Sequence, residues 1–135
     1  MGDEVLSRYA TRLETEGNDA SLEPDAVDDL GCFGYLRGAR ERALFLELRK
    51  ASGDSLAVAY ALIETIAFSP SEGITITAGL THLTIRGRHL KSEVRPGVEL
   101  HQGLLRQRVL FVHEASQAQM MQAAEGACVV ECVEW

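Results

Sequence analysis

The chain has 135 residues, of which 46% are hydrophobic and 24% are charged, the size and composition of one soluble globular domain. Its net charge of −7 is contributed by residues 1–30, because residues 31–135 hold eleven acidic and eleven basic side chains. This balance argues against a protein that binds nucleic acid with its whole surface, although it leaves room for a local basic patch.

The first 30 residues are predicted to form an amphipathic helix followed by an acidic linker. A helix is expected over residues 3–16, and its apolar stripe is narrow enough to need a partner surface, on the body of the protein or on another chain. This stripe consists of Val5, Leu6, Tyr9 and Leu13. The Asp-rich stretch 17–30 is interpreted as a solvated connector or as a partner-binding acidic tail. Residues 31–135 are expected to form a single globular, β-rich domain.

Residues 31–69 are predicted to contain three strands and one ambiguous stretch. The strands are expected at residues 43–50, 56–62 and 64–69. Pairing Leu48 with Val58 keeps one face of the first two strands apolar. The run 56–62 also has alanines on its other face, so it is expected at the centre of a sheet. Stretch 31–42, which contains three glycines, is either a glycine-bent strand or an irregular loop.

The clearest pattern lies in residues 73–90, which alternate isoleucine and leucine with threonine and other polar residues. Period-two alternation predicts half-buried strands, and Gly79 as the first residue of a two-residue loop favours a type II′ hairpin turn. The predicted register pairs Ala78 with Thr81, Thr77 with His82, Ile76 with Leu83, Thr75 with Thr84 and Ile74 with Ile85. A slip of one residue would place isoleucine opposite threonine, so the pattern specifies this register.

The C-terminal part is predicted to hold two short helices and two strands. Pro96 breaks the helical spacing after the hairpin, which leaves a turn near residues 89–95 and a short helix near residues 98–106. A strand at residues 109–113 precedes a second helix, which begins with the capping-box sequence Ser116 to Gln119. This helix is expected to end at Gly126, and a Val-rich strand is expected over residues 128–135. Together the elements predict an α+β domain around a mostly antiparallel, strongly bent sheet or small barrel of six to seven short strands.

A cluster of basic side chains at the end of the hairpin is the candidate ligand-binding site. Its members are Arg86, Arg88, His89 and Lys91, with Arg95 further along and His82 in line on the polar face. Guanidinium groups just past a strand end suit a phosphate or carboxylate, whereas the plainer interpretation is a solvated rim. A second basic group consists of Arg37, Arg40 and Arg42. The sequence leaves open whether the two groups form one patch.

No catalytic or metal-binding spacing is recognised, and no cofactor is expected. The four histidines lack HxxxH spacing, and in a strand Cys128 and Cys132 would lie about 13 Å apart, too far to share a zinc ion or a disulfide. Cys32 with a histidine is a possible nucleophilic dyad, without local support. The longest apolar run, residues 56–63, is too short to span a membrane, and no secretory signal opens the chain. We expect a cytoplasmic protein with reduced thiols.

The sequence therefore favours a non-enzymatic interaction module that forms a homo-oligomer or binds a protein partner. The first alternative is a binder of a phosphate-bearing ligand, either a nucleotide or nucleic acid, through residues 86–95. The second alternative is a small enzyme that uses Cys32 or a histidine.

Overall fold

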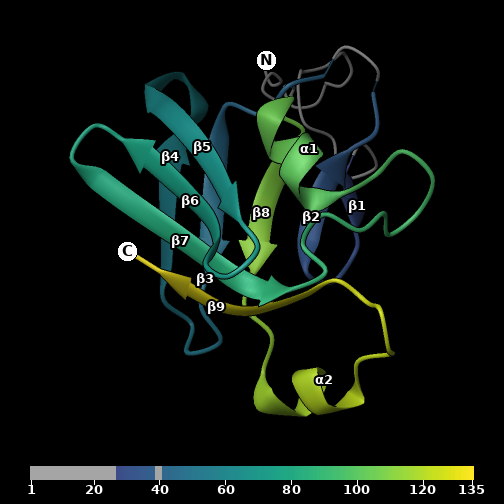
Figure 1. Ribbon diagram of the computed structural model, residues 1–135. Coiled ribbons are helices and arrows are strands. Elements are labelled where there is room, and N and C mark those ends of the chain that lie inside the picture. Colours follow the sequence, from purple (N-terminus) through teal and green to yellow (C-terminus); the bar gives the residue numbers. More distant parts are fainter. Residues whose placement is uncertain (1–26, 39–40) are drawn as a thin grey trace, which may run out of the picture.

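The computed structural model describes residues 27–38 and 41–135, which form two β-sheets and two short α-helices (Figure 1). The five-stranded sheet has the order β1-β2-β8-β3-β4 and consists of β1 (Val27–Asp29), β2 (Phe33–Leu36), β8 (Val109–His113), β3 (Phe45–Arg49) and β4 (Ser55–Ala59). The four-stranded sheet has the order β5-β6-β7-β9 and consists of β5 (Ile63–Ser69), β6 (Gly73–Ala78), β7 (Thr81–Arg88) and β9 (Val129–Glu134). The helices are α1 (Leu100–Leu105) and α2 (Gln117–Gln122).

The β6–β7 hairpin confirms the register that the alternating sequence predicts. Ile74 pairs with Ile85 and Ile76 with Leu83, and these four side chains are completely buried. Gly79 has a φ of +63°, which a turn of the predicted kind requires at its first position. Beside this hairpin, β9 pairs with β7 in the same sheet and completes one face of the core.

The strand predicted at residues 56–62 is shorter, and its place in the sheet differs from the prediction. Leu48 pairs with Leu56 rather than with Val58, a shift of two residues that leaves the same side chains on the apolar face. The strand ends at Ala59, where a 3₁₀ turn (Tyr60–Leu62) carries the chain from one sheet to the other. The expectation of a central strand is wrong, because β4 is an edge strand and its alanines face outward.

One core fills the space between the sheets. The five-stranded sheet contributes Phe33, Leu36, Leu46, Leu48 and Val112, and the four-stranded sheet contributes Ile74, Ile76, Leu83, Ile85 and Val133. At one end α1 inserts Leu100 and Leu104 into this core, whereas α2 at the opposite end has no buried residue (Figure 1). Both helices begin near the predicted residues, and α2 has the predicted capping box between Ser116 and Gln119.

The fold class predicted from the sequence is wrong. The structure is mostly β, with 48% strand and 14% helix, rather than α+β. In the described residues nine strands form two sheets that do not close into a barrel, instead of one bent sheet of six to seven strands. The difference arises because the 3₁₀ turn after β4 moves the chain to a second sheet, and because β1 and β2 form in stretches whose sequence resembles a linker and a loop.

The N-terminal helix predicted over residues 3–16 lies outside the described residues. Of the expected acidic linker, residues 27–29 form β1, and Val27 pairs with Leu36 of β2. Within the described part of the chain, no helix is long and apolar enough to cross a membrane.

Candidate functional site

The predicted basic cluster lies on the outer face of β7, where carboxylates of the neighbouring strand accompany its arginines. Arg86 Nη1 is 3.6 Å from a carboxylate oxygen of Glu134, and Arg88 Nε is 2.9 Å from one of Glu131. Arg88 also donates to the main-chain oxygen of Met120 in α2. These exposed pairs contribute little to stability, but they partly neutralise the cations that a phosphate would need. The phosphate-binding role of this segment stays a prediction.

The other predicted members of the cluster are spread along the surface. His82 is exposed on the same face of β7, opposite Thr77, and His89 follows the strand with a φ of +57°. Lys91 lies over the ring of Phe68, 4.9 Å from its centroid. His101 packs on that same ring, and burial, followed by the charge of Lys91, lowers its pKa.

The two arginine groups do not form one patch as a whole, but one member of each meets at Asp28. Arg37 of the second group and Arg95 of the cluster beyond the hairpin both form ion pairs with this carboxylate, which belongs to β1. Arg40 lies outside the described residues. Arg42 lies in a different group of arginines, which the sequence pattern does not predict.

Arg42 lines a hollow of about 620 Å³ with two arginines that follow α1, Arg106 and Arg108. Arg108 is anchored: its Nη2 donates to the main-chain oxygen of Leu36 at 2.6 Å, and its guanidinium lies over Tyr35. Arg42 and Arg106 are exposed, and no carboxylate among the described residues forms an ion pair with either of them. Among the described residues that line the hollow, Glu41 is the one acidic side chain. We call this feature the arginine hollow.

A groove of about 230 Å³ lies between the end of α1 and the start of β5, on the other side of the segment that carries Arg106 and Arg108. Its lining combines the apolar side chains of Tyr60, Ile63, Ile66, Leu104 and Leu105 with the polar side chains of Glu64, Thr65 and Gln107. Three leucines in the groove and in the segments next to it are exposed: Leu62 is 65% exposed, Leu105 48% and Leu44 78%. Main-chain hydrogen bonds join these segments, from Tyr60 N to Leu44 O and from Ala43 N to Gln107 O. Groove and arginine hollow therefore flank one short segment, residues 104–108.

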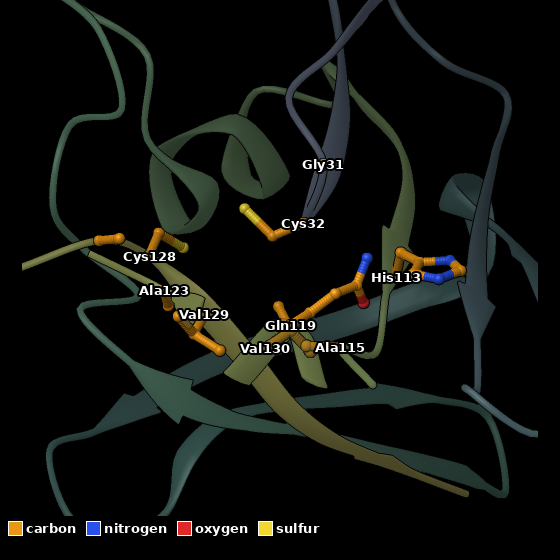
Figure 2. Close-up of a pocket in the computed structure, with 10 residues that line it drawn as sticks. Gly31, Cys32, His113, Ala115, Gln119, Ala123, Cys128, Val129 and Val130 are labelled. Atoms are coloured by element: carbon orange, nitrogen blue, oxygen red, sulfur yellow. The ribbon is translucent and has the colours of Figure 1, made fainter. Parts of the chain in front are cut away.

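A third feature is a pocket of about 170 Å³ beneath α2, at the seam between the sheets (Figure 2). Cys32 enters it from the tight turn between β1 and β2, where Gly31 has a φ of +88° and Leu30 N donates to Phe33 O. Cys128, the residue immediately before β9, also lines the pocket. The wall is mainly apolar and includes Ala115, Ala123, Ala127, Val129 and Val130.

The thiols of Cys32 and Cys128 face one another in this pocket (Figure 2). A hydrogen bond from the Cys128 thiol lowers the pKa of Cys32 below its ordinary value, against the opposing effect of burial. The same hydrogen bond, together with burial, raises the pKa of Cys128. Both cysteines are free and partly exposed. Cys132 lies within β9 as predicted, and burial, followed by the charges of Glu134 and Glu114, raises its pKa.

A Cys32–histidine dyad gains no support from the geometry. His113 lines the same pocket and its main-chain N donates to Cys32 O, but its imidazole points away from the thiol (Figure 2). Among residues 27–38 and 41–135, no three His, Cys, Asp or Glu side chains gather into a possible metal site. The partner of Cys32 is therefore a second thiol, 96 residues along the chain, which no local spacing could indicate.

Comparison with known proteins identifies no relative: no protein-family model, curated protein or solved structure matches the chain.

Proposed function

We propose that the chain is a protein-interaction module that assembles with a second copy of itself, in which the N-terminal segment of each copy binds the other. The binding surface comprises the groove between α1 and β5, the exposed leucines beside it and the adjoining arginine hollow, and we call it the leucine–arginine surface. The observation that carries the proposal is the exposure of Leu44, Leu62 and Leu105 beside the unpaired charges of Arg42 and Arg106. Exposed apolar groups gathered beside cations suit an apolar, acidic partner.

Residues 1–26 have the matching chemistry. They carry seven acidic and two basic side chains, and their predicted helix has a stripe of four apolar residues. All five charged residues between positions 14 and 25 are acidic, next to the point where the described chain begins. A helix of this length is marginal in water by itself, so it gains most of its stability from a surface on which the stripe can pack.

The start of the described chain lies close enough to this surface for the segment to reach it. Val27 pairs with Leu36, and Leu36 N donates to Arg108 O at 2.8 Å, so Val27 lies about two strand spacings, ~10 Å, from the arginine hollow. In a dimer with two-fold symmetry, the same surface of each copy faces the other. The ten residues 17–26 can extend about 33 Å, enough for each acidic connector to cross to the partner.

The test is the solution mass of four proteins measured by light scattering in low and high salt. The full chain should be a dimer that weakens as salt screens the arginine contacts, and a chain lacking residues 1–25, which keeps β1 intact, should be a monomer. Leu62→Glu should also give a monomer. The matched control is Met121→Glu, because Met121 is 80% exposed and lies in α2, at the opposite end of the core from α1 (Figure 1).

A monomeric full chain, or a dimer that persists without residues 1–25, would contradict the proposal. A monomer whose truncated form binds a synthetic peptide of residues 1–26 would also contradict assembly, and would place the segment on its own chain. Circular dichroism of each variant separates loss of assembly from loss of folding.

A further inference from the structure

Two thiols from distant parts of the chain share the pocket beneath α2. Cys32 immediately precedes β2 of the five-stranded sheet, and Cys128 immediately precedes β9 of the four-stranded sheet. Their side chains face one another (Figure 2). Main-chain hydrogen bonds hold the two segments that carry these cysteines in place. His113 N donates to Cys32 O, and Ala115 N donates to Val130 O, each at 2.8 Å.

We propose that Cys32 and Cys128 form a redox-active dithiol that low-molecular-weight disulfides oxidise, with Cys32 as the attacking thiol and Cys128 as the resolving thiol. This inference is independent of the assembly proposed above. Three features of the pocket support it: the two thiol groups that face one another in it (Figure 2), their partial exposure, and an apolar wall that leaves space for a small thiol.

The direction of attack follows from the two environments. The hydrogen bond from Cys128 stabilises the thiolate of Cys32, and the thiolate is the nucleophile in thiol–disulfide exchange. Cys128 keeps its proton, because the hydrogen bond and burial both disfavour its thiolate until the Cys32 charge is gone. Mixed-disulfide formation at Cys32 removes that charge and frees Cys128 to react.

The reaction balances in two exchanges. In the first, Cys32 Sγ attacks oxidised glutathione, the glutathione S–S bond breaks, and one glutathione thiolate leaves and takes a proton from water. In the second, Cys128 gives its proton to solvent and attacks Cys32 Sγ, which releases the second glutathione. The product is a Cys32–Cys128 disulfide, and two molecules of glutathione carry away the hydrogen equivalents.

Access to the site is provided by α2. This helix has six residues and none of them is buried. Its capping box is local to its own N-terminus, and the hydrogen bond from Arg88 to Met120 O joins it to β7. An element with so few buried contacts belongs to the least stable part of a fold, so it opens at low cost and admits the oxidant.

The experiment treats the full chain with oxidised glutathione and maps the products by mass spectrometry. No lysine or arginine follows Arg108, so trypsin leaves Cys128 and Cys132 on one peptide, and a second cleavage at Glu131 separates them. The expected product is a peptide pair joined through Cys32 and Cys128, with Cys132 free and no retained glutathione. This measurement needs no variant and therefore no assumption about folding.

Serine variants assign the roles. Cys128→Ser should stop at a stable glutathione adduct on Cys32, and Cys32→Ser should react about tenfold more slowly. Cys132→Ser is the matched control and should behave as the unmodified chain does, because Cys132 lies about 13 Å along β9 from Cys128. Glutathione retained on Cys32 in the unmodified chain, or fastest modification at Cys132, would overturn the proposal.

Discussion

Tyr60 marks the point where the chain passes from one sheet to the other, and its hydroxyl provides a quantitative test of the fold. The side chain is 6% exposed, and its hydroxyl donates to Val109 O at 2.7 Å. Tyr60→Phe removes this buried hydrogen bond and leaves the packing of the ring intact. We expect a loss of about 1.5 kcal/mol in the free energy of unfolding at pH 8. With a typical urea slope, the midpoint should fall by roughly 1 M.

The pH dependence gives the same prediction a second, independent check. Burial raises the pKa of Tyr60 above its ordinary value of 10, so the folded chain keeps the phenol protonated where the unfolded chain ionises it. The stability due to Tyr60 is therefore fully present below pH 10 and is lost above it, by about 1.4 kcal/mol per pH unit. The difference in the free energy of unfolding between the unmodified chain and the Tyr60→Phe variant should therefore vanish near pH 11, about one pH unit above the ordinary pKa of tyrosine.

The assay is urea unfolding of both proteins, followed by circular dichroism at pH 8, 10 and 11. A constant difference across this range would refute the claim that Tyr60 remains protonated in the folded state. An equal midpoint at pH 8 would refute the contribution of the hydrogen bond itself.

Substitutions at two further positions test how β9 is held. Gly87→Ala should destabilise the fold by about 3 kcal/mol or more in thermal unfolding, because the added Cβ would lie 1.9 Å from Val129 O across the β7–β9 pair. Glu114→Ala should cost about 2–3 kcal/mol, because its carboxylate accepts from the main-chain N of Ala51 and of Val133, each at 2.9 Å. Glu114→Gln retains one acceptor and should cost less; equal losses for the two Glu114 variants would contradict this assignment.

Some elements of the fold could be predicted because their information is local. The hairpin register follows from the alternation in residues 73–90, and α2 follows from the reciprocal hydrogen bonds of Ser116 and Gln119. In both cases residues within a few positions of each other determine the conformation, so the sequence pattern suffices. The short helix α1 and strand β8 were predicted on the same basis.

The candidate sites depend on contacts that local patterns do not contain. Periodicity shows that a strand exists, but it does not show which strand lies beside it or where the chain changes sheets. For this reason the sequence predicts β4 at the centre of a sheet although it lies at an edge, and it does not associate Arg106 with Arg42.

The sequence by itself therefore determined the register of the β6–β7 hairpin, the capped start of α2 and the separation of acidic charge in the N-terminal segment. The tertiary structure alone decided that two sheets share the core, that Arg86 and Arg88 lie beside carboxylates of β9, and that Cys32 meets Cys128. The physical reason is the range of the interactions. Turns, caps and alternation act between neighbours in sequence, whereas sheet order and side-chain partners are selected by packing between segments far apart in the chain.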